Sequence, residues 1–208
     1  MNAILNIFTS FTTSNCYIIR PFKDDKCFIV DLPPDLEPVL SYISSNNLSI
    51  AGALLTHGHY DHALGLQSFD GHAYINLDDE FLARNPHEQI KSLLGHNIDI
   101  EEYKGDLYSV DNLMSEHINI YKNPGHTKGS VSYEFPEEGI VFTGDFVFKD
   151  SIGRTDLFSG SSEEMTKSIK NIFSEFNEDF EIHPGHGPSG KVRSIRNNNE
   201  YIKALVND

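Results

Sequence analysis

Short apolar runs alternate with amphipathic segments along the first third of the chain. Runs rich in β-branched and aromatic residues are typical of strands, whereas apolar residues three and four positions apart are typical of helices. We therefore expect strands at 3–8, 16–20 and 27–30, a helix over 36–43, a strand at 51–55, a helix over 63–69 and a strand at 73–76.

A similar order of patterns returns in the second half of the chain. It predicts strands at 118–121, 130–135 and 140–143, a helix over 162–173, a strand at 180–182 and a terminal helix that includes 201–206. Between the halves, residues 78–115 hold two short helical patterns (78–83 and 87–94) and a polar, acidic stretch. We interpret 78–115 as an insertion that covers the active site of a single domain spanning 1–208.

The repeated order of elements predicts an α/β protein in which two sheets pack face to face with helices outside. A chain of 208 residues is long enough to bury a substantial core.

The formal net charge of −15 disfavours binding to nucleic acids and to anionic membranes. No apolar run approaches the length of a membrane span, and no secretory signal opens the sequence. Cys16 and Cys27 fall in apolar runs, where small buried side chains are expected. We therefore expect a cytoplasmic protein with a small-molecule substrate, and its oligomeric state stays open.

Residues 56–62, which we call the histidine loop, read Thr-His-Gly-His-Tyr-Asp-His. Neutral imidazole and carboxylate are the usual nitrogen and oxygen ligands of zinc, iron and manganese. His57 and His59 can reach one ion if the segment is extended. Asp61 and His62 lie where a helix begins, and they face a second position. The alternative, a polar loop with locally bonded histidines, explains one histidine better than four ligand-type residues.

Three further segments have a ligand-type residue at the junction of a strand and a loop. In each of them a glycine comes directly before the ligand-type residue: Gly125-His126, Gly144-Asp145 and Gly185-His186. Glycine permits a tight turn and a close approach of the backbone, which a buried ion requires.

Taken together, His-x-His-x-Asp-His, Gly-His-Thr-x-Gly-Ser (125–130), Thr-Gly-Asp (143–145) and Pro-Gly-His-Gly (184–187) resemble the metallo-β-lactamase fold superfamily over nearly the whole chain. The resemblance implies a four-layer αβ/βα sandwich of two mixed β-sheets with helices outside. It also implies two divalent metal ions, with zinc expected first and iron or manganese as alternatives. The implied ligands are His57, His59 and His126 for one ion, Asp61, His62 and His186 for the other, and Asp145 between them.

The implied chemistry is hydrolysis by a water that the two ions acidify, because a bound Zn²⁺ lowers the pKa of water from about 15.7 to about 7. Asp61 and Asp145 are the candidate catalytic residues that orient the proton of this water. A thioester suits the site because its thiolate leaves with little help from an acid.

The Gly-Arg-Thr-Asp segment at 153–156 resembles the short glyoxalase II-like hydrolases and the iron-dependent persulfide dioxygenases. The leading interpretation is therefore a thioesterase for S-lactoylglutathione or a similar substrate. One alternative is a dioxygenase with a single Fe(II) held by His57, His126 and Asp145, and another is a lactone or ester hydrolase. A metal-binding domain with a vestigial site is the alternative without catalysis.

Basic residues near the motifs are candidates for contact with an anionic substrate. Lys149 and Arg154 are the substrate candidates that we carry forward, with Lys191 and Arg193 beside them. Arg154 and Asp156 could instead form an internal ion pair that shapes the loop, or support the metal ligands from outside. The chain ends about 20 residues after His186, so we expect it to lack the C-terminal helical domain of full-length glyoxalase II.

Overall fold

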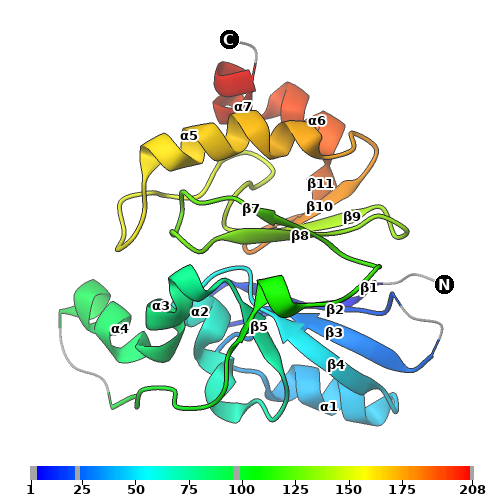
Figure 1. Cartoon of the computed structure of the whole chain (residues 1–208), viewed down its shortest axis with the longest axis vertical. Coiled ribbons are helices and arrows are strands. Elements are labelled where there is room, and N and C mark those ends of the chain that lie inside the picture. The colour runs from blue at the N-terminus through cyan, green and yellow to red at the C-terminus, as the bar shows by residue number, and fades with distance from the viewer. Residues whose placement is uncertain (1–3, 22–23, 96–98, 207–208) are drawn as a thin grey trace. The chain divides into compact units, whose positions relative to one another are not determined.

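The computed structural model describes residues 4–21, 24–95 and 99–206. The chain divides into two compact units, Met1–Leu113 and Met114–Asp208 (Figure 1). Each unit is built on one mixed β-sheet with helices, which confirms the predicted α/β class. Of the predicted first strand, Ala3 lies outside the described residues. That 1–208 forms a single domain stays a prediction.

The first unit contains a six-stranded sheet in the order β1-β2-β3-β4-β5-β6. Its strands are β1 (Ile4–Thr9), β2 (Asn15–Ile19), β3 (Lys26–Val30), β4 (Ser49–Leu54), β5 (Ala73–Ile75) and β6 (Tyr108–Ser109). The first three strands are antiparallel and the pairs from β3 to β6 are parallel. The helices are α1 (Glu37–Ser45), α2 (Tyr60–Ala63), α3 (Glu80–Arg84) and α4 (Pro86–Leu94). Short 3₁₀ helices cover Leu64–Ser68, Leu77–Asp79 and Val110–Asn112.

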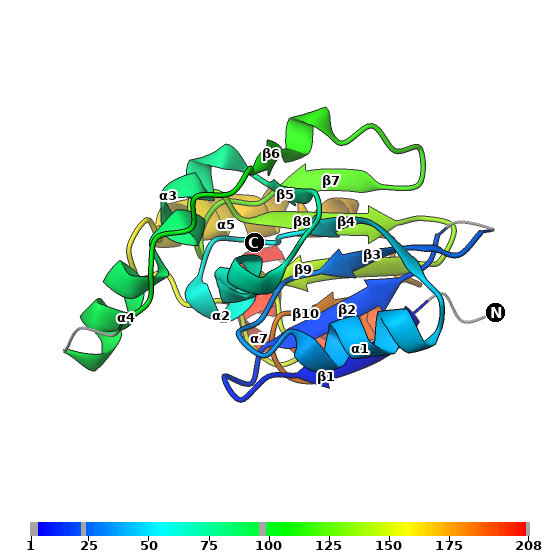
Figure 2. The ribbon, with the colours of Figure 1, turned by 90° about the horizontal axis from the view of Figure 1, so that it is seen from below.

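Helix α1 lies over one face of this sheet (Figure 2). Its buried residues Val39 and Ile43 belong to a core cluster that also contains both cysteines. Cys16 and Cys27 are free thiols, and burial raises the pKa of Cys16 well above its usual range and that of Cys27 to about 11. Both thiols are therefore protonated at neutral pH, as expected of small packed side chains.

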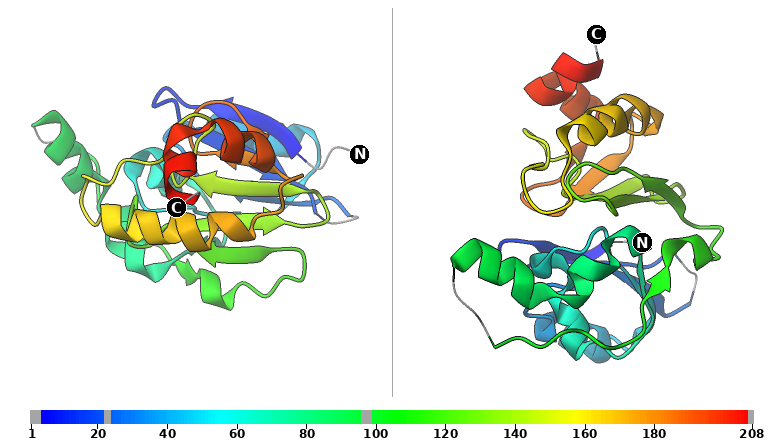
Figure 3. Two further views of the ribbon diagram at one scale, coloured as in Figure 1. Left: turned by 90° about the horizontal axis from the view of Figure 1, so that it is seen from above. Right: turned by 60° about the vertical axis from the view of Figure 1, so that its left-hand side comes forward.

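The second unit contains a five-stranded sheet in the order β11-β10-β9-β8-β7. Its strands are β7 (Asn119–Lys122), β8 (Val131–Phe135), β9 (Ile140–Gly144), β10 (Glu181–Pro184) and β11 (Gly190–Lys191). Strands β9 and β10 are parallel, and the other pairs are antiparallel. Helices α5 (Ser162–Asn171), α6 (Val192–Asn198) and α7 (Glu200–Val206) lie over one face of the sheet (Figure 3). The described helices of both units include none long and apolar enough to cross a bilayer.

The segment 162–173, predicted as one helix, packs its apolar residues into the core of the second unit. Met165, Ile169 and Phe173 cluster with Ile182 of β10 and Ile202 of α7. The predicted helix ends two residues early, at Asn171, and a 3₁₀ turn over Phe173–Glu175 follows it.

The prediction of one helix over 63–69 was wrong. Helix α2 begins three residues earlier, at Tyr60, and the chain continues as a 3₁₀ helix over Leu64–Ser68. Gly65 donates its N–H to the carbonyl of Leu32 at 2.9 Å, a long-range bond that the local pattern does not contain.

Strands β6 and β11 and helix α6 were not predicted. The two strands have two residues each, too few to show an alternating pattern. The pairing of β6 with β5 joins residues 78–115 to the sheet of the first unit. That these residues cover an active site stays a prediction.

Candidate functional site

The four candidate ligands of the histidine loop lie together at the end of β4. His59 is extended (φ −67°, ψ 146°) and its carbonyl accepts from the N–H groups of His62 and Ala63, which starts α2. The ring centroid of His57 lies 4.9 Å from that of His59 and 4.4 Å from that of His62. Asp61 Oδ2 lies 3.6 Å from His62 Nε2. The extended start and helical end of the loop agree with the sequence interpretation.

A buried carboxylate that the sequence analysis did not select holds this loop in place. Asp31 follows β3, whose Val30 pairs with Leu54 of β4, so Asp31 lies beside the start of the loop. Its Oδ1 accepts from the N–H of Thr56 at 2.7 Å, and its two oxygens lie 3.0 and 2.9 Å from Thr56 Oγ1. Its Oδ2 lies 2.9 Å from His62 Nδ1.

In the neutral rings of His62 and His57, these contacts fix which nitrogen carries the proton. A carboxylate only accepts, so His62 Nδ1 donates to Asp31 and Nε2 keeps the lone pair. Thr56 Oγ1 donates to Asp31 and therefore accepts from His57 Nδ1, which lies 3.1 Å away. Both imidazoles thus have Nε2 in the form that binds a metal ion.

The three candidate ligands of the second unit also lie together. Strands β9 and β10 are parallel neighbours with Gly144 opposite Pro184, so Asp145 and His186 leave the same edge of the sheet. Asp145 Oδ2 lies 3.5 Å from His126 Nε2 and 3.6 Å from His186 Nε2. Ligand atoms about 2.0–2.2 Å from one tetrahedral ion are roughly 3.3–3.6 Å apart. One oxygen at this spacing from two imidazoles fits a carboxylate that shares ions with both.

The orientation of His126 depends on the Gly-Arg-Thr-Asp segment. His126 Nδ1 lies 2.7 Å from the carbonyl oxygen of Arg154, which only accepts, so in the neutral ring Nε2 carries the lone pair. Gly153 packs so closely that a Cβ there would collide with the carbonyl oxygen of Asp145 and lie 3.2 Å from His126 Cβ. The segment therefore supports two candidate ligands through its backbone.

The side chain of Arg154 forms the internal ion pair considered from the sequence. Its Nε and Nη2 donate to the two carboxylate oxygens of Asp156 at 2.7 and 2.8 Å. Both side chains are exposed. Lys149 is exposed as well. Contact of Lys149 or Arg154 with a substrate stays a prediction.

We expect Arg154→Ala to raise the pKa of Asp156 without loss of metal binding. The hydrogen bonds from Arg154 hold the pKa of Asp156 at about 2, whereas a free Asp titrates near about 3.9. The ion pair therefore favours the folded state above about pH 3.9, and this contribution is lost as the pH falls towards 2. NMR titration of the Asp156 carboxyl carbon measures the shift, with Arg154→Lys as the control. An unchanged Asp156 titration in Arg154→Ala would contradict this assignment.

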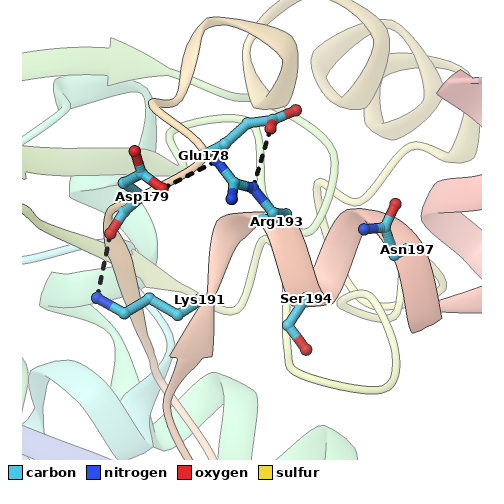
Figure 4. Close-up of a pocket in the computed structure, with 6 residues that line it drawn as sticks. All are labelled: Glu178, Asp179, Lys191, Arg193, Ser194 and Asn197. Atoms are coloured by element: carbon cyan, nitrogen blue, oxygen red, sulfur yellow. Dashed lines mark hydrogen bonds and ion pairs between the residues drawn. The ribbon is translucent and has the colours of Figure 1, made fainter.

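A separate recess of about 540 Å³ lies on the second unit, lined by Glu178, Asp179, Lys191, Arg193, Ser194 and Asn197 (Figure 4). Arg193 donates to Glu178 at 3.3 Å and to Asp179 at 2.9 Å. Lys191 Nζ donates to the carbonyl of Asp179 at 3.1 Å. Both cations are thus engaged with acidic residues or main chain within the recess.

The donor set fits divalent metal ions on each unit taken by itself. His57, His59, Asp61 and His62 gather on the first unit, and His126, Asp145 and His186 on the second. The sequence analysis missed Asp31, Thr56 and the carbonyl of Arg154, which fix the imidazole tautomers. The signal for Asp31 was available, because an acidic residue directly follows a predicted strand.

Comparisons with known proteins identify the family of the chain. The family model described as "Metallo-beta-lactamase superfamily" matches residues 9–186. The chain is 29% identical to hydroxyacylglutathione hydrolase GloC of Haemophilus influenzae, over 91% of this chain and 93% of that protein. It is also 29% identical to the probable metallo-hydrolase YqgX of Bacillus subtilis, over 92% and 93% of the two chains. The crystal structure of BLEG-1 B3 metallo-beta-lactamase is similar with a TM-score of 0.83 and 26% identity, over 96% and 99% of the two chains.

Proposed function

The chain belongs to the metallo-beta-lactamase superfamily, and on that premise we propose that it is a thioester hydrolase of the glyoxalase II type that uses two divalent metal ions. S-lactoylglutathione is the model substrate, because a relative over nearly the full length is named a hydroxyacylglutathione hydrolase. We place the activity in the cytoplasm, since both cysteines are free thiols, as suits a reducing compartment.

The proposal assigns each candidate ligand a role. His57, His59 and His126 would hold one ion, Asp61, His62 and His186 the other, and Asp145 would bridge them. Bound ions of this kind acidify a water molecule and polarise the substrate carbonyl. Zinc is expected first, with iron or manganese as alternatives, because histidine and carboxylate ligands suit all three.

The residues of the chain would position the reactants. Asp61 and Asp145 orient the proton of the attacking water, whose oxygen adds to the acyl carbon. The C–S bond then breaks, which yields a carboxylic acid and a thiol. Asp31 and the carbonyl of Arg154 keep His57, His62 and His126 in the tautomer that leaves Nε2 free for an ion.

The observation that carries the proposal is the position of Asp145 Oδ2 between His126 Nε2 and His186 Nε2, at 3.5 and 3.6 Å. In an ordinary ion pair, a carboxylate oxygen would have a single nitrogen partner. Here the same oxygen lies at ligand spacing from two imidazole nitrogens, so it could share an ion with either of them.

The test is hydrolysis of S-lactoylglutathione by protein loaded separately with Zn²⁺, Fe²⁺ or Mn²⁺. We expect turnover with at least one metal, and we expect His126→Ala to lower kcat/KM by more than about 100-fold, since even outer partners of ligands cost about 10–100-fold. His72→Ala is the control, because His72 is exposed and belongs to no candidate group.

The outcomes separate the alternatives. Thioester turnover that His126→Ala removes supports the proposal. Failure with every metal, together with O₂ uptake on glutathione persulfide by the Fe²⁺ form, would replace it with a dioxygenase. Turnover of lactones or simple esters alone would keep the hydrolytic site and change the substrate class.

A further inference from the structure

The histidine loop has main-chain groups that its own short helix cannot satisfy. The first N–H groups of a helix have no partner within that helix. Two side chains from residues 77–94 meet these groups. Asp79 Oδ2 accepts from the N–H of Gly58 at 2.9 Å. Gln89 Oε1 accepts from the N–H of Tyr60 at 3.0 Å, and Gln89 Nε2 donates to the carbonyl of Gly58 at 3.1 Å.

Gln89 is itself fixed in one orientation. Its Nε2 also donates to the carbonyl of Leu82 at 2.7 Å. A carboxamide has two N–H donors and one carbonyl acceptor, and each of these is engaged here. Gln89 lies on α4, which contacts both α3 and α2, the short helix at the end of the loop (Figure 1).

The loop also packs tightly against α3. A Cβ on Gly58 would lie 2.7 Å from both the Asp79 carbonyl oxygen and Leu82 Cβ, so the backbone approaches as closely as a glycine allows. Asp79 is fully buried. The loop therefore rests against a fixed surface rather than in solvent.

We infer that Gln89 is a positioning residue that pre-forms the histidine loop for metal binding, through its paired hydrogen bonds to Gly58 and Tyr60. These two residues alternate with the candidate ligands His57, His59 and Asp61 along the chain. When their backbone is fixed, the directions in which the three ligand side chains leave the backbone are fixed as well. The inference rests on the proposed function, because it assumes that the loop binds a metal ion.

Two substitutions of Gln89 remove different parts of its hydrogen bonding to Gly58, Tyr60 and Leu82. Gln89→Met keeps the length of the side chain and loses all three hydrogen bonds. Gln89→Glu keeps the acceptor for the Tyr60 N–H but cannot donate to the carbonyls of Gly58 and Leu82. Ser92→Ala on the same helix is the matched control, because Ser92 is exposed.

The experiment measures Zn²⁺ affinity of the full chain by competition with a chelator, and amide hydrogen exchange of the metal-free protein. We expect Gln89→Met to weaken Zn²⁺ binding by about 10- to 100-fold. We expect Gln89→Glu to weaken it at least as much, because a carboxylate oxygen would then face the carbonyl oxygens of Gly58 and Leu82. We expect the Tyr60 amide to lose protection in Gln89→Met, while the amides of the β3–β4 pair keep the protection that they have in Ser92→Ala.

Wild-type affinity and wild-type Tyr60 protection in Gln89→Met would overturn the inference. If Gln89→Met does not fold, Gln89→Glu provides the same two readouts. A wild-type protein that binds neither Zn²⁺, Fe²⁺ nor Mn²⁺ would contradict the proposed function instead. Hydrogen exchange of the metal-free chain would then still decide whether Gln89 orders the loop.

Discussion

Asp145→Asn is expected to lower thioester hydrolysis by more than about 100-fold and to reduce the metal content below two ions per chain. The amide keeps the shape of the carboxylate but has no negative charge. One of its two polar atoms becomes an N–H₂ group, which cannot bind a cation. The oxygen that lies 3.5 Å from His126 Nε2 and 3.6 Å from His186 Nε2 therefore loses the charge that offsets two cations.

Metal analysis of the purified chain and kcat/KM on S-lactoylglutathione measure the two effects. Asp150→Asn is the matched control, because Asp150 is an exposed carboxylate five residues further on. An Asp145→Asn chain that keeps two ions and the wild-type rate would rule out the bridging role. Loss of one ion with full activity would point to a site that needs a single metal.

The candidate ligands could be predicted because they follow strands that are readable from their apolar pattern. Asp145 directly follows β9, and His186 comes two residues after β10. The glycines before the candidate ligands were expected to permit tight turns. Two of them, Gly125 and Gly144, have positive φ values of 155° and 50°, which favour glycine. The local sequence therefore indicates both the residue type of each candidate ligand and its place near a strand end.

The support of these ligands was harder to predict because it is long-range. Asp31 lies 31 positions from His62, and Gln89 lies 31 positions from Gly58. The first pair depends on the register between β3 and β4, and the second on how α4 docks beside α2. Neither the strand register nor the docking of the helix can be read from the spacing of apolar residues along the chain. The contact between His126 and Arg154 uses a backbone carbonyl, which every residue has, so no residue type could have indicated it.

Substitution of Asp31 is also expected to have a large effect. Asp31→Ala tests its contribution to stability, and Asp31→Asn tests its contribution to metal binding. Asp31 is 1% exposed and accepts from the N–H and hydroxyl of Thr56 and from His62 Nδ1. Asp31→Ala leaves these buried donors unmatched, at about 1–3 kcal/mol each. The φ of 62° at this position adds a further cost of about 1–2 kcal/mol for alanine. We expect the free energy of unfolding to fall by at least about 3 kcal/mol.

Asp31→Asn tests the second effect with the fold largely kept. Asparagine tolerates the left-handed conformation and keeps one oxygen for the Thr56 N–H. Its N–H₂ group cannot accept from His62 Nδ1, so the imidazole loses the contact that leaves Nε2 free. We expect Zn²⁺ affinity to fall by about 10- to 100-fold, with a smaller change in urea unfolding than in Asp31→Ala. Asp35→Asn, at an exposed carboxylate four residues on, is the control. Equal losses of stability in both Asp31 variants, with Zn²⁺ affinity intact in Asp31→Asn, would make Asp31 a residue of the fold alone.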